Sequence, residues 1–373
     1  MSDVYDGKAI SKLGFGLMRL PRKGPFTDLE QTAEMVDRFM EAGCTYFDTA
    51  FVYLGSENAI RKALVDRYPR ASYTLATKLN ATLTLNEKTA RKQLETSLER
   101  TGAQYVDYYL LHALMENNYR KYDAYHLWDF VREQKERGLI RHIGFSFHGG
   151  PELLDRLLTE HPETEFVQLQ LNYADWESPS VASRANYEVA RRHGMPIVVM
   201  EPVKGGKLAH PPQDVEALLK AHHPDMSCAS WAIRFAASLE GILTVLSGMS
   251  SIEQMEDNLA YMRDFRPLDE EERRIIREAQ KLLGKSTAIG CTACRYCVEG
   301  CPKQIAIPEM FAAMNVRLGN GQIAEAAEAY GQAAPEGHRA ADCVKCGKCE
   351  LACPQHLPVR ELLGTVSDTF DKE

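Results

Sequence analysis

Eight cysteines near the end of the chain form two groups with one shared spacing, C-x2-C-x2-C-x3-C-P. The groups are Cys291, Cys294, Cys297, Cys301 and Cys343, Cys346, Cys349, Cys353. Three thiolates at this spacing can hold three corners of a 4Fe–4S cluster, and the fourth thiolate serves the cluster of the other group. The spacing therefore predicts two 4Fe–4S clusters, one on Cys291, Cys294, Cys297 and Cys353, and one on Cys343, Cys346, Cys349 and Cys301.

Structural zinc is the alternative for a cysteine-rich segment. Zinc sites favour paired C-x2-C knuckles with four ligands, whereas each group here is a set of three plus one cysteine that precedes Pro302 or Pro354. The only other cysteines, Cys44 and Cys228, lie far upstream. In a reducing compartment such crowding indicates metal ligation and not disulfide bonds.

Four polar residues in the first third of the chain could perform acid–base chemistry. Asp48, Lys78 and His112 each end a short apolar run, and Tyr53 follows Asp48 by five residues. Reduction of a carbonyl needs a hydride on carbon and a proton on oxygen. A free tyrosine has a pKa near about 10, and a neighbouring lysine ammonium lowers it by favouring the phenolate.

We therefore predict Tyr53 as acid/base, Lys78 as its activator, Asp48 as the partner of Lys78, and His112 as the group that orients the carbonyl. Each residue alone has an ordinary explanation. Asp48 could cap a helix, Lys78 could be a solvated charge, and His112 could be a core histidine. Their joint position after successive apolar runs is what favours a site.

Short apolar runs alternate with amphipathic segments from about residue 13 to residue 265, which favours eight parallel strands in a closed barrel over an open doubly wound sheet. A barrel places the ends of its strands around one mouth, where active sites lie. The predicted strands are Leu13–Met18, Thr45–Thr49, Tyr73–Thr77, Tyr105–Leu111, Ile140–Phe145, Phe166–Leu171, Pro196–Met200 and Leu243–Leu246. The predicted helices are Leu29–Ala42, Glu57–Arg67, Glu87–Thr101, Arg120–Arg137, Pro151–Leu158, Ser183–His193 and Cys228–Ala237.

The barrel is expected to end with a charged helix, Asp269–Leu283, before Gly284. We expect a barrel domain over residues 1–285 and an iron–sulfur domain over residues 286–373. The insert between the cysteine groups, residues 302–342, is expected to be helical.

The motif Asp48-Thr49-Ala50 with Tyr53, followed by Gly55-Ser56-Glu57, resembles the signature of the aldo-keto reductase family. Lys78 and His112 match the other two members of that family's catalytic tetrad. The resemblance covers roughly residues 8–265 and implies a (β/α)8 barrel that binds an extended nicotinamide cofactor without a Rossmann fold. No G-x-G-x-x-G follows a predicted strand, in agreement with that expectation.

The same resemblance implies the cofactor contacts. Ser146 and Gln168 match the residues that hold the nicotinamide amide, but Phe147 replaces the family asparagine. Met200 replaces the stacking aromatic residue, and Glu201 replaces a serine.

The loop and helix that carry Gly248, Gln254 and Asn258 match those that grip the adenosine end of the cofactor. NADPH-using relatives place Lys or Arg there for the 2′-phosphate, whereas Glu253, Glu256 and Asp257 are acidic. NAD(H) is therefore favoured over NADP(H), with Lys204 or Lys207 as the residues able to reverse that preference.

The cysteine region resembles bacterial two-cluster ferredoxins, and its helical insert resembles the α-helical ferredoxin variant. Lys303, Lys345 and Lys348 lie near the cysteines. They are either a docking surface for a ferredoxin or flavodoxin or simply solvated charges.

The composition excludes other classes of function. The 373 residues carry a net charge of −8, which gives no reason to expect nucleic acid or an anionic membrane as partner. No stretch has the roughly 18 apolar residues of a membrane span, and Met1–Ile10 has no signal-peptide pattern. We expect a cytoplasmic protein.

Three functions remain open. The barrel interconverts a small carbonyl and an alcohol with NAD(P)H, while the clusters are structural or sense redox state. Alternatively, the clusters exchange electrons with a flavin or substrate in the barrel, because a one-electron cluster and a two-electron hydride carrier commonly need a flavin between them. In the third, the chain is a non-catalytic docking or regulatory subunit of an electron-transfer complex.

Overall fold

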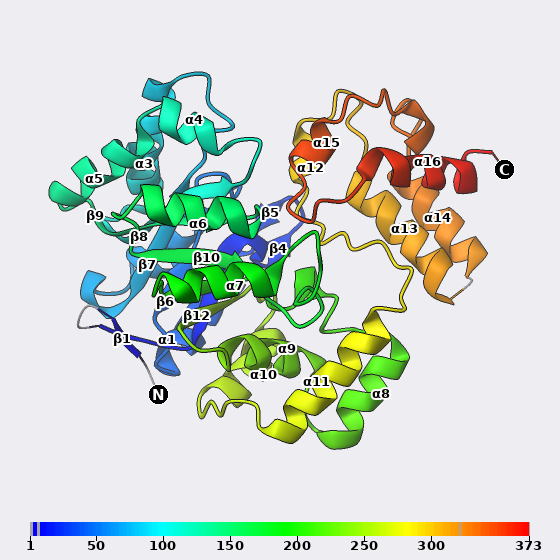
Figure 1. Ribbon diagram of the computed structural model, residues 1–373, viewed down its shortest axis with the longest axis horizontal. Helices are drawn as coiled ribbons and strands as arrows, with labels where there is room; N and C mark the ends of the chain where they lie inside the picture. The colour runs from blue at the N-terminus through cyan, green and yellow to red at the C-terminus, as the bar shows by residue number, and fades with distance from the viewer. Residues whose placement is uncertain (1–2, 6–7, 321, 373) are drawn as a thin grey trace.

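The computed structural model describes residues 3–5, 8–320 and 322–372. Figure 1 shows a strand-and-helix body that holds the first three quarters of the chain and a smaller lobe of helices at the upper right, coloured orange to red. The described helices include none that is both long and apolar enough to cross a membrane.

Eight parallel strands close into a barrel, as predicted, so the open doubly wound sheet is excluded. Each strand pairs with the next in sequence, and the last pairs with the first through Ser247 and Phe15. The strands are β3 (Leu13–Gly16), β6 (Tyr46–Asp48), β7 (Thr74–Leu79), β8 (Val106–Leu114), β9 (Ile140–Phe147), β10 (Phe166–Gln170), β11 (Ile197–Met200) and β12 (Ile242–Ser247).

Every residue of β7 and β8 is buried, because the barrel interior covers one face of each strand and the outer helices cover the other. The same geometry explains Gly144 in β9. A Cβ atom at Gly144 would lie 2.5 Å from the ring of Phe166 on the neighbouring strand. The strands thus pack around a filled core and leave their carboxyl ends free to carry a site.

Helices surround the barrel (Figure 1). Their bounds are α1 (Leu29–Glu41), α2 (Ser56–Ile60), α3 (Glu87–Thr101), α4 (Tyr119–Ala124), α5 (Leu127–Glu136), α6 (Pro151–Glu160), α7 (Ser183–Arg192), α8 (Gln213–His222), α9 (Cys228–Ala237), α10 (Ile252–Met262) and α11 (Glu270–Leu283). The π-helix Arg61–Val65 continues α2, and 3-10 turns lie at Leu17–Arg19, Arg70–Ser72, Lys204–Gly206 and Ala340–Asp342. Helix α8 and the hairpins β1–β2 (Asp3–Tyr5, Lys8–Ile10) and β4–β5 (Arg22–Lys23, Phe26–Thr27) were not predicted.

The expected single helix over 120–137 is wrong, because the structure has two helices with a break at His126. His126 has a left-handed φ of 50°. Both Tyr122 and Leu127 are buried, yet five residues apart they would face opposite sides of one continuous helix. The break brings both side chains to the core.

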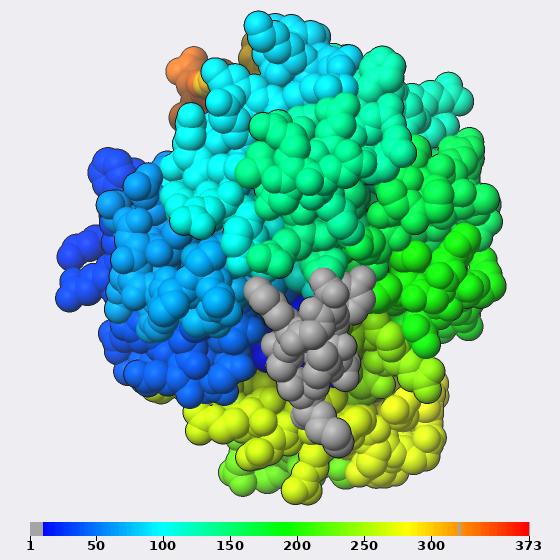
Figure 2. All heavy atoms as spheres, turned by 90° about the vertical axis from the view of Figure 1, so that its left-hand side faces the viewer, coloured from blue at the N-terminus to red at the C-terminus, as the bar shows by residue number. Residues whose placement is uncertain are grey.

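The C-terminal lobe contains α12 (Tyr296–Glu299), α13 (Ile307–Asn320), α14 (Ile323–Ala333), α15 (Lys348–Leu351) and α16 (Val359–Phe370). It has its own apolar core, which includes Met310, Phe311, Leu363 and Val366. In Figure 2, one face of the molecule consists of barrel segments, and the lobe contributes only a few orange atoms at the upper edge. The contacts described below place the lobe at the carboxyl ends of the barrel strands.

Candidate functional site

A buried ion pair lies at the carboxyl ends of β6 and β7. The Nζ of Lys78 donates to Oδ1 of Asp48 at 2.5 Å and to the carbonyl oxygen of Thr49 at 2.7 Å. Nε2 of Gln168 donates to the other carboxylate oxygen of Asp48 at 3.3 Å. Lys78 and Asp48 are 1% and 3% exposed, so the pair is shielded from water. This is the partnership that the sequence predicted for the two residues.

Tyr53 and His112 lie beside this pair. The Nζ of Lys78 is 5.1 Å from the centre of the Tyr53 ring. The Tyr53 and His112 ring centres are 5.8 Å apart, and their planes meet at 81°. The structure therefore brings together all four residues of the expected tetrad at one end of the barrel.

Burial governs the pKa values of the four residues. It raises the pKa of Asp48 and lowers that of Lys78, and the attraction between the two opposes both shifts. It also raises the pKa of Tyr53 well above its usual value, and Tyr296 and Asp48 add to that rise. The net shift of the Tyr53 pKa is therefore upward, because burial is its largest cause, and the role of Lys78 as activator of Tyr53 stays a prediction.

His112 is held in its neutral form. Burial, followed by the charges of Lys78 and His148, lowers its pKa well below the usual value. A neutral imidazole donates from one ring nitrogen and accepts at the other. Nδ1 of His112 is buried without a hydrogen-bond partner in the described part of the chain. Such a ring can donate a hydrogen bond to a substrate oxygen without adding a charge to the site.

A large cavity lies above the tetrad, with about 1750 Å³ of empty volume including its opening to solvent. Asp48, Tyr53 and His112 lie in its wall. The predicted cofactor contacts in its wall are Gln168, Met200, Glu201, Gly248, Gln254 and Asn258.

Ser146 differs from the other predicted contacts. Within the described residues it is not in the wall of this cavity, and its hydroxyl oxygen accepts from the backbone N–H of Ala113 at 2.7 Å. Ala113 has a left-handed φ of 57°, which turns this N–H towards β9. The structure thus places Ser146 as a support for the strand end that carries His112.

The far end of the cavity reaches the start of α10. The Oε1 of Gln254 accepts from the backbone N–H of Ser250 at 2.8 Å, and the Ser250 hydroxyl donates to the carbonyl of Arg19 at 2.7 Å. Glu253 and Asp257 also lie in this wall. This end of the cavity is therefore acidic.

The two lysines that could reach into the cavity are engaged elsewhere. The Nζ of Lys204 forms an ion pair with Asp175, and that of Lys207 donates to the carbonyl of Ile289. In the described part of the chain, the cavity wall contains Arg19 but no lysine. Arg19 itself donates to the carbonyl of Thr292 at 2.7 Å and lies 3.7 Å from Glu201.

The helical lobe completes the cavity with residues that sequence reasoning missed. Cys294, Tyr296, Pro354 and Gln355 lie in the same wall as Tyr53. The Tyr296 side chain adds to the rise in the pKa of Tyr53, and its ring centre is 6.5 Å from that of His112. The one sequence feature that could have predicted this contact is the aromatic residue Tyr296 between Cys294 and Cys297. The barrel motifs do not indicate which residues of the lobe reach the cavity.

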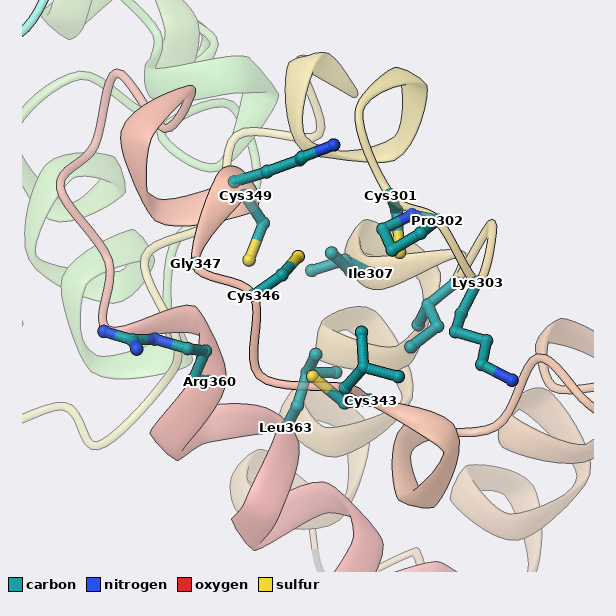
Figure 3. A pocket seen from close by; sticks show the side chains of 13 residues that line it. Cys301, Pro302, Lys303, Ile307, Cys343, Cys346, Gly347, Cys349, Arg360 and Leu363 are labelled. Atoms are coloured by element: carbon teal, nitrogen blue, oxygen red, sulfur yellow. The ribbon is translucent and has the colours of Figure 1, made fainter.

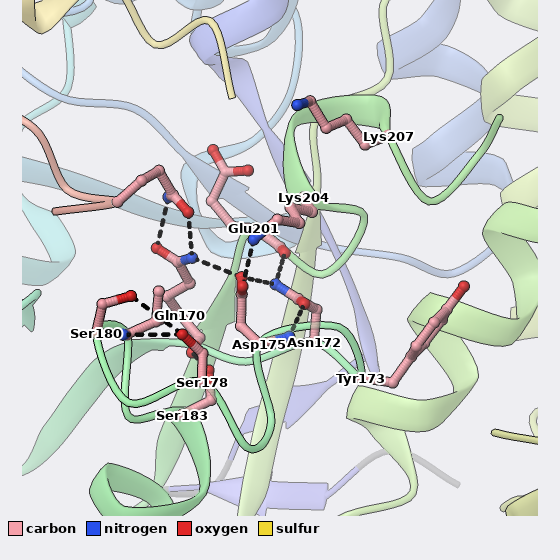
Figure 4. Close-up of polar contacts among 12 residues, drawn as sticks. Gln170, Asn172, Tyr173, Asp175, Ser178, Ser180, Ser183, Glu201, Lys204 and Lys207 are labelled. Carbon is pink, nitrogen blue, oxygen red and sulfur yellow. Dashed lines mark hydrogen bonds and ion pairs between the residues drawn. The ribbon is translucent and has the colours of Figure 1, made fainter. Parts of the chain in front are cut away.

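Several hydrogen bonds fasten the lobe to the barrel. The side chains of Gln170 and Gln355 donate to each other. Gln170 also donates to Asp175 at 3.0 Å (Figure 4). Nε2 of His356 lies 2.7 Å from the carbonyl oxygen of His148. These contacts come from the segment that follows Cys353.

A close backbone approach between Gly205 and Thr292 also joins the barrel to the lobe. Gly205 has a φ of 66°, and a Cβ atom there would lie 2.6 Å from the carbonyl oxygen of Thr292. A side chain at position 205 would therefore force the segment around Cys291 away from the barrel.

The eight cysteines of the lobe form two sets. Figure 3 shows the sulfur atoms of one set around a shared space. Each set surrounds a cavity of about 330 Å³ of empty volume. The first cavity is lined by Cys291, Cys294, Cys297 and Cys353, and the second by Cys301, Cys343, Cys346 and Cys349.

These sulfur positions suit a cluster better than one metal ion. Among the described residues, no three His, Cys, Asp or Glu side chains are close enough together to hold a single metal. Zn–S bonds of about 2.3 Å would pull four sulfurs into one tight tetrahedron. Burial raises the pKa of the Cys294 and Cys297 thiols to about 12, and neighbouring cysteines add to that rise, so four thiolates there need a cationic partner.

The fold and site define a (β/α)8-barrel oxidoreductase that carries an iron–sulfur domain. Residues 12–281 match the sequence model of the "Aldo/keto reductase family", and residues 290–357 match that of the "4Fe-4S dicluster domain". The chain belongs to the aldo/keto reductase family.

Curated relatives match more than half of the chain. An aldo-keto reductase from Mycolicibacterium vanbaalenii is 31% identical over 259 residues, 69% of this chain and 84% of that protein. Aldo-keto reductase str7 from Strobilurus tenacellus is 29% identical over 212 residues, 53% of this chain and 60% of that protein. The match thus spans less than two thirds of str7.

Solved structures share the barrel fold. The holo form of aldo-keto reductase AKR11C1 from Bacillus halodurans has a TM-score of 0.60 at 24% identity, covering 75% of this chain and 95% of that one. An aldo/keto reductase from Klebsiella pneumoniae in complex with NADP and acetate has a TM-score of 0.59 at 19% identity, covering 74% and 93%.

Proposed function

We propose that this protein interconverts a small carbonyl compound and the corresponding alcohol by hydride transfer with a nicotinamide cofactor bound in the barrel cavity. The observation that carries the proposal is that Tyr53, His112 and Asp48 lie in the wall of one cavity, with Lys78 paired to Asp48 beside it. The cofactor would supply or accept the hydride at the substrate carbon. The chain's own residues would handle the proton and orient the oxygen.

The high pKa of Tyr53 keeps the phenol protonated, which suits a proton donor during reduction. As the proton leaves for the substrate oxygen, negative charge develops on the Tyr53 oxygen. The Lys78 ammonium, held by Asp48, lies close enough to stabilise that charge. His112 would donate a hydrogen bond to the same oxygen and fix its orientation.

We propose NAD(H) in preference to NADP(H). The cavity can hold a nicotinamide at Gln168 and Met200 and an adenosine at Gln254 and Asn258. Glu253 and Asp257 would repel a 2′-phosphate, and Lys204 and Lys207 are bound elsewhere. Klebsiella pneumoniae structures of similar fold contain NADP or NADPH, so the preference is a property we assign to this chain alone.

We further propose that the domain over residues 286–373 holds two 4Fe–4S clusters and that the barrel domain spans residues 1–285. The two sets of four cysteines around separate cavities support this number. Each set joins three cysteines of one motif to the last cysteine of the other, which ties both segments into one unit. Clusters of this kind and reduced thiols suit the cytoplasm, where we place the protein.

Electron exchange between the clusters and the barrel is the second candidate. Its support is that Cys294, a proposed ligand, and Tyr53 lie in the wall of one cavity. A flavin in the cavity would link the two kinds of transfer. Exposed Lys303, Lys345 and Lys348 near the other cysteine set could receive a ferredoxin or flavodoxin. A non-catalytic role is disfavoured, because three of the tetrad residues line an open cavity and the fourth, Lys78, is paired with one of them.

Anaerobic purification followed by release of the bound nucleotide tests the cofactor. Release of NAD supports the first proposal, and release of a flavin supports the second. In a turnover assay, Tyr53→Phe should reduce NADH-dependent carbonyl reduction by about 10²- to 10⁴-fold with the cluster absorbance preserved. Tyr330→Phe, which removes a hydroxyl away from the cavity, is the control. Equal turnover in the protein and its Tyr53→Phe variant would refute the assigned acid.

A further inference from the structure

Tyr296 joins the two domains at the reacting end of the cavity. It lies between Cys294 and Cys297 and begins α12 (Tyr296–Glu299). The preceding residue, Arg295, has a left-handed φ of 66° and pairs with Glu309. The turn at Arg295 directs the Tyr296 side chain into the wall of the barrel cavity.

Tyr296 lies in the same cavity wall as Tyr53, the group that must donate to a substrate. Tyr53 has a single O–H hydrogen, and Tyr296 adds to the rise in the pKa of Tyr53. A reacting oxygen needs the same hydrogen. The Tyr296 ring also lies close to that of His112, the second group expected to face that oxygen.

We propose that the Tyr53 hydroxyl donates to that of Tyr296 in the resting protein, so that Tyr296 occupies the place of the substrate oxygen and a substrate must displace it. This inference rests on the proposed carbonyl chemistry at Tyr53. If Tyr296 must be displaced, this residue of the iron–sulfur domain helps to determine which substrates bind in the barrel cavity. A carbonyl or carboxylate oxygen is a stronger acceptor than a phenol oxygen and can replace it.

The surrounding structure holds Tyr296 in this position. The guanidinium of Arg19 fixes the carbonyl of Thr292 at 2.7 Å, and the close approach to Gly205 fixes the same residue. The proposed cluster ligands Cys294 and Cys297 flank Tyr296 on both sides. The position of the Tyr296 hydroxyl is therefore set by the backbone of this loop, which is held on both sides, and not by a mobile side chain.

Equilibrium binding of acetate tests the proposal, because a carboxylate oxygen can accept from Tyr53 without any turnover. The variant Tyr296→Phe keeps the ring and removes only the hydroxyl. Its dissociation constant for acetate should be roughly two- to tenfold lower than that of the unchanged protein, since one competing hydrogen bond is gone. Calorimetry gives the constant, and the visible circular dichroism of the clusters reports whether the loop around Tyr296 responds to acetate.

Two further variants make the result specific. Tyr330→Phe removes a hydroxyl that contacts Asp371 within the lobe and should leave acetate binding unchanged. In a Tyr53→Phe background, Tyr296→Phe should have little effect, because the hydrogen bond is already absent. Iron content must match in all variants.

Unchanged or weaker acetate binding in Tyr296→Phe would overturn the inference, as would the absence of measurable binding in both proteins. Loss of turnover in Tyr53→Phe with unaltered acetate binding in Tyr296→Phe would overturn it and leave the proposed function intact. Normal turnover in Tyr53→Phe would instead remove the proposed function.

Discussion

The side-chain amides of Gln170 and Gln355 form a reciprocal pair, with both N···O distances at 3.0 Å. Gln170 ends β10 of the barrel, and Gln355 follows Cys353 by two residues. Both are buried. The pair therefore couples the wall of the barrel cavity to a proposed ligand of the nearer cluster.

Replacing one member of this pair should destabilise the protein. In Gln355→Leu, the amide of Gln170 loses a buried partner, which costs about 1–3 kcal/mol of the free energy of unfolding. The double variant with Gln170→Leu should cost less than the sum of the two single changes. Urea unfolding followed by circular dichroism measures these values. The exposed Gln332→Leu is the control, and an equal effect there would contradict the role of the pair.

The ion pair beneath Tyr53 should be sensitive to the loss of one partner. Lys78→Met leaves the carboxylate of Asp48 buried without its counter-charge, which costs about 3–5 kcal/mol. The same unfolding measurement applies. Lys62→Met breaks an exposed pair with Asp66 at 3.3 Å and should leave the stability nearly unchanged. Similar losses in the two variants would show that burial does not govern the pair.

The contact between α9 and α11 should weaken in acid. Burial alone raises the pKa of Glu272, but hydrogen bonds from Arg234 and from the backbone of Asp269 lower it to about 2. Because the folded-state pKa lies below the usual value of 4.5, the stabilisation is present above pH 4.5 and is lost as the pH falls towards about 2.

The measurement for this contact compares the unchanged protein with Glu272→Gln across that pH range by unfolding. The difference in stability should be constant above pH 4.5 and shrink below it. The exposed Glu361→Gln should show no such trend. A stability difference that does not change with pH would mean that Glu272 keeps the same charge over this pH range.

The two crossing cysteines should have different effects on the barrel. Cys301→Ser and Cys353→Ser should each lower the iron content by about half, because each removes a ligand of one proposed cluster. Only Cys353→Ser should also change acetate binding in the cavity, since Gln355 and Pro354 lie in its wall. Iron analysis and calorimetry give both values. An equal effect of the two variants on acetate binding would argue against the assigned crossing.

The barrel was largely predictable because its strands and helices follow from patterns of apolar and polar residues within short segments. The short apolar runs and amphipathic helices placed all eight strands, and parallel strands buried on both faces leave a clear signal. The break at His126 was not predictable from periodicity, because two buried faces in different phases look like one long helix. The spacing of the cysteines and the motif at Asp48 and Tyr53 likewise needed no structure.

The amino-acid sequence alone determined which residues can bind metal or move protons, since spacing along a strand, turn or cysteine motif is a local property. Only the tertiary structure decided that Tyr296 faces Tyr53, that Gln355 binds Gln170, and that burial raises the pKa of the phenol. These relationships join segments more than a hundred residues apart. Their geometry depends on how the iron–sulfur domain packs against the barrel mouth, which no local pattern encodes.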